Sequence, residues 1–192
     1  MKSRRIFILM ANPDKDTMSN YFAGVYEKAA GDAGHDVRRT NLVDMQFDPL
    51  LHLGYKVIQP LEPDLLKVQE DIRWADHFVV VFPIWWSGMP SLLKAMFERM
   101  WLPGFAFHFH KSNMGWDKLL RGKTSRIITL SKMHPWAIRF MFGNFSNALK
   151  SSILQFSGFK VRETNIGFSE TMSKRSKARW TKCIEYYALR GK

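Results

Sequence analysis

The chain has 192 residues, of which 46% are hydrophobic, and a formal net charge of +12. This length is typical of one buried core, so we expect a single domain over residues 1–192. No apolar run is long enough for a transmembrane helix. The single cysteine, Cys183, excludes an internal disulfide and fits a reducing compartment, so we expect a cytoplasmic location.

Much of the positive charge lies in a C-terminal run over residues 174–182, which alternates with apolar residues up to Tyr187. This spacing predicts the solvated face of an amphipathic helix. No zinc-finger, basic-zipper or RNA-binding aromatic motif accompanies the run. Binding of nucleic acid is therefore a lesser alternative, and we expect no nucleic-acid partner.

The first elements alternate between strand and helix. Residues 5–10 (RIFILM) form a continuous apolar run, which predicts a strand covered on both faces. Apolar residues at helical spacing follow over residues 21–30, and Gly34 is placed to end that helix. Residues 36–41 predict a weaker edge strand. Residues 45–61 contain two prolines and a glycine and predict a long, structured loop.

The middle of the chain repeats the alternation. A helix is expected over residues 63–75, and residues 77–82 (HFVVVF) give the clearest central strand. Pro90 suits the first position of the next helix, because its missing N–H costs nothing there. Residues 92–101 continue that helix as one apolar stripe.

The last third predicts strands at residues 126–131 and 160–166, with a mainly helical segment at 138–156 between them. Gly158 is expected to cap that segment, and a terminal helix closes the chain. Five strands alternating with helices predict an α/β fold: an open five-stranded parallel sheet with helices on both faces. Such sheets bind ligands at the carboxyl ends of their strands.

The loop after the first strand, ANPDKDTMSN, leads into a helix. The free N–H groups of a helix N-terminus suit a phosphate, and Thr17 and Ser19 add hydroxyl donors. An ordinary helix cap is an equal alternative. The loop has neither a P-loop motif nor a dinucleotide-binding glycine pattern.

The loop after the central strand, PIWWSG, holds two adjacent tryptophans. Pro83 stiffens the turn and Gly88 permits close approach of a backbone. Main-chain N–H groups here can bind the edge of a heteroaromatic ring while an indole covers its face. The alternative is that Trp85 and Trp86 are core or subunit-interface residues.

The run FPIWWSGMPSLLKAMFERMWLPGFAF resembles the signature of the flavodoxin-like NAD(P)H:quinone oxidoreductases, which include DT-diaphorase, the modulator-of-drug-activity proteins and ancillary flavoproteins of potassium efflux. Further matching pieces lie in the same order over residues 4–168. The resemblance implies a flavodoxin-like three-layer sandwich. It also implies an enzyme that passes two electrons, as a hydride, from NAD(P)H through a flavin to a quinone or similar flat acceptor.

By this resemblance, three loops hold the flavin. The short chain favours FMN, with FAD as the alternative, because little sequence remains to hold an adenine. The implied cofactor-binding residues are Asn12, Asp16, Thr17, Met18 and Ser19 after the first strand, Pro83, Ile84, Trp85, Trp86 and Ser87 after the third, and Leu130, Ser131, Lys132 and Met133 after the fourth.

The fourth-strand loop departs from the family pattern, because glycines are replaced by bulkier residues. Lys132 is the candidate for stabilising reduced flavin, and His134 the candidate for proton transfer to the acceptor. The family also roofs its substrate site with aromatic residues, often from a second subunit, which implies a homodimer with its active site near the interface. The implied substrate-binding residues are Trp86, Phe105, Phe107 and Phe109.

Two other features bear on function. His108 and His110 lack a third ligand, so we expect no metal site. The missing glycines also leave open a second function, a regulatory flavoprotein with little turnover that contacts a membrane transporter or the membrane periphery.

Overall fold

Five parallel strands form the centre of the computed structural model, which describes residues 2–110 and 114–192. Their order across the sheet is β2-β1-β3-β6-β7. The inner strands β1 and β3 are almost wholly buried, which explains their continuous apolar sequences. The predicted parallel sheet and its edge strand β2 are confirmed. The strands are β1 (Arg5–Met10), β2 (Asp36–Asn41), β3 (His77–Pro83), β6 (Thr124–Leu130) and β7 (Lys160–Ile166).

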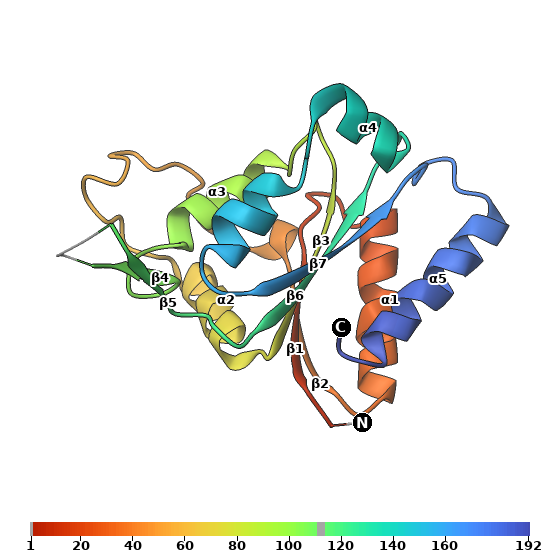
Figure 1. Ribbon diagram of the computed structural model, residues 1–192, viewed down its shortest axis with the longest axis horizontal. Helices are drawn as coiled ribbons and strands as arrows, with labels where there is room; N and C mark the ends of the chain where they lie inside the picture. The colour runs from red at the N-terminus through yellow and green to blue at the C-terminus, as the bar shows by residue number, and fades with distance from the viewer. Residues whose placement is uncertain (1, 111–113) are drawn as a thin grey trace.

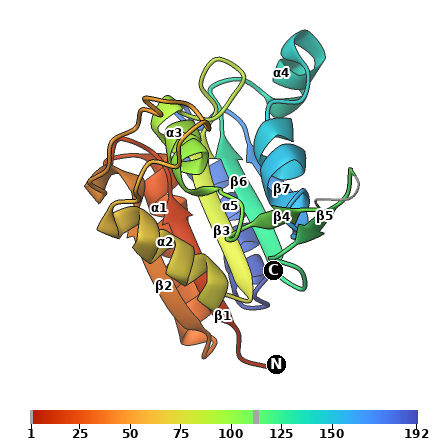
Figure 2. The ribbon, with the colours of Figure 1, turned by 90° about the vertical axis from the view of Figure 1, so that its left-hand side faces the viewer.

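Helices cover both faces of the sheet (Figures 1 and 2). On one face, α1 (Met18–Asp32) and α5 (Lys174–Ala188) bury apolar side chains against β1 and β3. On the other face lie α2 (Pro63–Trp74), α3 (Ser91–Met100) and the π-helix η2 (Ala148–Gln155). Within the described ranges, the helices are all too short or too polar to cross a bilayer.

The mainly helical segment predicted over residues 138–156 forms two helices and not one. The chain forms α4 (Pro135–Phe142), which ends at Gly143, and then η2 after a short connection. Gly143 has a φ of +83°, a conformation that side-chain-bearing residues disfavour. Gly158 follows η2 with a φ of +108°, and a Cβ there would lie 2.9 Å from the backbone nitrogen of Arg121. These glycines turn the chain sharply at both ends of η2.

Three smaller features differ from the sequence-based expectations. Pro90 is the residue before α3, not its first helical residue. A two-stranded antiparallel pair, β4 (Phe107–Phe109) and β5 (Trp116–Lys118), was not predicted, because three-residue strands are too short to show alternation. A single turn of 3-10 helix, η1 (Leu42–Asp44), follows β2.

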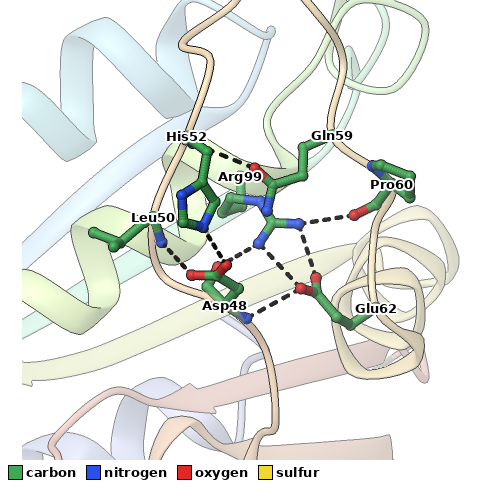
Figure 3. Close-up of polar contacts among 7 residues, drawn as sticks. All are labelled: Asp48, Leu50, His52, Gln59, Pro60, Glu62 and Arg99. Atoms are coloured by element: carbon green, nitrogen blue, oxygen red, sulfur yellow. Dashed lines mark hydrogen bonds and ion pairs between the residues drawn. The ribbon is translucent and has the colours of Figure 1, made fainter.

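The loop over residues 45–61 is held against α3 by one buried arginine (Figure 3). Arg99 donates to the carbonyl of Pro60 (2.8 Å), to Glu62 Oε2 (2.9 Å) and to the carbonyl of Asp48. Burial raises the pKa of Glu62, but hydrogen bonds from the Asp48 N–H and from Arg99 outweigh it and hold that pKa below its usual value. This long loop is therefore structured, as its sequence predicts.

Candidate functional site

A crevice opens at the carboxyl ends of the strands. One part has a volume of about 560 Å³ and the other about 460 Å³. The crevice adjoins the ends of β1 and β3, between which the direction of winding reverses. We call this the strand-end crevice. Its two parts share as walls Pro83, Trp85, Leu130, Ser169 and Glu170.

The loop after β1 brings a set of hydrogen-bonding groups to the crevice at the start of α1. Asn12 Nδ2 donates to Thr17 Oγ1 (3.1 Å) and lies 3.4 Å from Ser19 Oγ. In the described part of the chain, the first-turn N–H groups of Met18 and Ser19 donate to no acceptor. A helix N-terminus with free N–H groups and adjacent hydroxyls is suited to bind a phosphate.

The charges around this loop are mixed. Asp14 and Asp16 both line the crevice, and the Asp16 N–H donates to Asp14 Oδ1 at 2.9 Å. Lys15 instead forms an ion pair with Asp44, and its hydrogen bond is the largest cause that lowers the pKa of Asp44. The cation among the walls at this end is Lys177 of α5. An anion bound here would therefore approach the helix N-terminus and Lys177 while avoiding two carboxylates.

The loop after β3 makes a tight turn whose tip holds the second tryptophan. The Trp85 N–H donates to the Gly88 carbonyl (3.0 Å), and the Gly88 N–H donates back (2.9 Å). Between them, Trp86 and Ser87 have φ values of +48° and +58°. Among described residues, the N–H groups of Trp86 and Ser87 have no acceptor. Trp86 is fully exposed, and both Trp85 and Trp86 are walls of this part of the crevice, so the turn presents free donors beside flat indoles.

The loop after β6 places three of its four predicted cofactor-binding residues, Leu130, Ser131 and Lys132, in the crevice. Ser131 and Lys132 are walls, and Lys132 forms an ion pair with Glu170 at 3.2 Å. The Met133 side chain is exposed and is not a wall. His134 is not a wall either: its Nδ1 accepts from the Trp136 N–H (3.3 Å) and caps α4. The roles expected of Met133 in flavin binding and of His134 in proton transfer stay predictions, and the walls of the crevice do not support them.

A fourth loop, after β7, also lines the crevice and was missed in the sequence. Ser169 and Glu170 line both parts, and Met172 lines the part near α1. The Ser169 N–H donates to the Ser131 carbonyl (3.0 Å), which ties this loop to the one after β6. The signal was present, because the carboxyl end of the fifth parallel strand must reach the same edge as the others.

Strained backbone conformations lie in the loops at the carboxyl ends of the strands. Among the described residues, three that are not glycine have a positive φ: Trp86, Ser87 and Phe168. The first two form the turn after β3, and Phe168 immediately precedes Ser169. Strained conformations of this kind persist where the surrounding structure fixes them, and they are frequent at ligand-binding sites.

A second cavity, of about 610 Å³, lies at the other end of the molecule, beside the β4–β5 pair. Phe107 and Phe109 line it together with Phe156 and Trp101, and it shares no wall with the strand-end crevice. We call it the aromatic cavity. Phe105 corrects an expectation: it is 4% exposed, packs edge-on against Trp101, and is not a wall of either cavity. Phe105 lies in the turn before β4, where its N–H donates to the Leu102 carbonyl at 3.2 Å, and not in the strand that carries Phe107 and Phe109.

His108 of β4 and His110, just after that strand, make no metal centre in the part of the chain that the structure describes. There, no three His, Cys, Asp or Glu side chains gather closely enough to hold a metal ion. His110 instead lies 3.1 Å from Asp117 on β5.

A model of the family with the flavodoxin-like fold matches residues 4–188. The chain belongs to this family. The flavodoxin-like family assignment agrees with the strand order and with the position of the crevice.

Known proteins of this family resemble the chain along most of its length. NAD(P)H dehydrogenase [quinone] 1 of Rattus norvegicus is 26% identical over 196 residues, which cover 88% of this chain and 70% of the rat protein. Two solved structures share the fold. The NAD(P)H:quinone oxidoreductase of Methanothermobacter marburgensis has a TM-score of 0.84 at 18% identity, covering 98% of both chains. An FMN-dependent NADH-azoreductase of Bacillus anthracis, in complex with FMN, has a TM-score of 0.72 at 17% identity, covering 96% of this chain and 97% of that one.

Proposed function

We propose that the chain is a flavin-dependent NAD(P)H oxidoreductase that delivers two electrons to a quinone or a similar flat acceptor. The observation that carries this proposal is the strand-end crevice, which combines an anion-binding helix start with a flat indole and a turn of free N–H donors. The relatives named as quinone reductases support it. A bound flavin would accept a hydride from NAD(P)H and would pass the two electrons on to the acceptor.

The residues of the crevice fit the phosphate of FMN. The free N–H groups of Met18 and Ser19 would donate to phosphate oxygens, and the Thr17 hydroxyl lies beside them. Lys177 adds a positive charge at this end. FMN is favoured over FAD because the structurally similar azoreductase of Bacillus anthracis is titled as an FMN complex.

The turn after β3 fits the ring of the flavin. Trp85 offers a flat wall to both parts of the crevice, and the N–H groups of Trp86 and Ser87 would meet polar atoms at the ring edge. The Ile84 N–H donates to the Leu130 carbonyl (2.7 Å), which fixes the start of the turn. This chain therefore orients the ring largely with its backbone, and its side chains shape access to it.

A homodimer is the second part of the proposal. Phe107 and Phe109 line the aromatic cavity and are not walls of the crevice. Their strand β4 lies at the other end of the molecule from α5 (Figure 1). One chain alone does not bring them to the crevice. A second copy that places its aromatic cavity over the crevice would roof the acceptor site with apolar rings, which suits a flat acceptor.

A regulatory flavoprotein with little turnover is a second candidate function. The loop after β6 carries Ser131 and Lys132 where the family commonly has glycines, and Lys132 is paired with Glu170 across the crevice. The side chains of Ser131 and Lys132 would narrow the space through which an electron acceptor reaches the flavin ring. The two functions share the cofactor and differ in the rate of electron transfer.

The experiment is quinone reduction by FMN-loaded protein with NADH or NADPH as donor. The proposal predicts turnover that Thr17→Ala weakens, with lower retention of FMN. Ser173→Ala is the matched control, because Ser173 caps α5 in the same way but is not a wall of the crevice. Retention of FMN without turnover would favour the regulatory function, and failure to retain any flavin would refute both.

A further inference from the structure

Helix α4 is unusual because four of its five large apolar side chains, Trp136, Phe140, Met141 and Phe142, are exposed. Its eight residues read PWAIRFMF, and Ile138 is the one that is buried. Phe140 is 86% exposed, and Trp136 is 66% exposed. A helix that is apolar on all sides is normally buried, so exposure of this one indicates a surface that meets another apolar phase or partner.

Neighbouring loops extend the exposed surface. His134, which caps α4, packs against both Trp136 and the exposed Phe168, with ring centroids 5.8 and 6.0 Å apart. Gly167 lies so close to Pro135 that a Cβ would meet Pro135 Cδ at 2.7 Å, which fixes the loop after β7 beside the helix. We call the exposed residues the apolar tip: Met133, Trp136, Phe140, Met141, Phe142 and Phe168.

The apolar tip projects from the molecule. In Figures 1 and 2, α4 stands at the end of the sheet where β3 and β6 terminate, beyond the body of the fold. It is a convex element of two turns and not a groove, so it is shaped to enter a soft apolar layer. A protein partner would instead need a cleft deep enough to receive aromatic side chains from all sides of a helix.

The charged residues next to the apolar tip in the chain are mainly basic. Arg139 on α4 itself is exposed, and Lys132, just before the tip, is paired with Glu170. Lys174 and Arg175 at the start of α5 are exposed as well. Exposed aromatic and methionine side chains together with exposed cations match the interface of an anionic bilayer.

We propose that the apolar tip docks the protein on anionic lipid membranes. Trp136, Phe140 and Phe142 enter the boundary between headgroups and acyl chains, and the surrounding lysines and arginines bind the anionic headgroups. The strand-end crevice lies at the same end of the sheet as the apolar tip. This inference concerns the surface alone and does not depend on the proposed function.

Flotation with vesicles tests the proposal on the full chain. Vesicles of phosphatidylcholine alone are compared with vesicles of phosphatidylcholine and phosphatidylglycerol in equal parts, at low and at high salt. The wild type should float with the mixed vesicles, and much less with phosphatidylcholine or at high salt. The double variant Phe140→Ser with Phe142→Ser should lower the bound fraction by about tenfold or more.

The matched control is Leu50→Ser with Leu53→Ser, which removes two leucines that are 60% and 63% exposed in the loop over residues 45–61. It should float like the wild type. Light scattering of each protein without lipid gives its mass. The proposal is overturned if the wild type does not float, if it binds both vesicle types equally, or if both double variants lose binding alike. It is also overturned if the Phe140 and Phe142 variant changes the mass of the protein, since the tip would then be a contact between copies.

Discussion

The turn from Trp85 to Gly88 stores backbone strain at the proposed ring-binding edge. Two hydrogen bonds close it, and both central residues, Trp86 and Ser87, have a positive φ. Hairpin turns with two such residues usually carry asparagine and glycine. Left-handed conformation costs an ordinary residue about 1–2 kcal/mol, whereas glycine adopts it freely.

Ser87→Gly should therefore stabilise the protein without flavin. Relief of strain contributes about 1–2 kcal/mol, and the greater freedom of glycine in the unfolded chain offsets about 0.5–1 kcal/mol of it. We expect the free energy of unfolding to rise by about 1 kcal/mol in urea titration. Binding of FMN should weaken by about fivefold, because the glycine leaves the free N–H groups less well fixed before binding.

Ser176→Gly is the matched control, because Ser176 is an exposed residue of α5 with ordinary helical geometry. The same substitution there should destabilise the protein by about 0.5 kcal/mol. If Ser87→Gly destabilised the protein as Ser176→Gly does, the turn would hold no strain. If it changed stability as expected but left FMN affinity untouched, the turn would not be part of the flavin site.

Three further changes test other parts of the structure. Burial lowers the pKa of His77 to about 3, so below about pH 6.5 the unfolded chain binds a proton that the folded chain does not. The free energy of unfolding should fall by about 2 kcal/mol more between pH 7 and pH 5 in the wild type than in His77→Asn, and equal urea profiles would refute this. Arg99→Met should cost about 3 kcal/mol and open residues 45–61 to protease, whereas cleavage unchanged from wild type would show that Arg99 does not hold that loop. Lys177→Gln should weaken FMN binding by about fivefold at low salt and less at high salt, and an equal effect at both would exclude a charge contact.

Much of the fold was readable because its strands are buried on both faces. The runs that became β1 and β3 are continuously apolar, and helices at regular intervals leave few arrangements for five such strands. The break at Gly143 was not readable, because α4 and η2 each carry apolar residues at helical spacing. The spacing of apolar residues predicts whether a segment is a helix or a strand more reliably than it predicts where that segment begins and ends.

The parts of the candidate site that follow from the order of the strands could be predicted from the sequence. The loops after β1, β3 and β6 all line the crevice, as the rule for parallel sheets implies. Lys177 was not predicted as a site residue, because the run of charges that contains it is typical of a solvated helix face. The sequence alone does not show which end of α5 lies at the crevice. The capping bond that His134 accepts from the Trp136 N–H could not be predicted, because it depends on where α4 begins.

The most direct test of the central claim is a titration of the flavin-free protein with FMN, followed by quenching of flavin fluorescence. A crevice with a phosphate-binding helix start and an indole wall predicts one FMN per chain, quenched on binding, with a dissociation constant of about 1 µM or below. Fluorescence that stays unquenched up to about 1 mM FMN, in protein shown to be folded, would contradict the account.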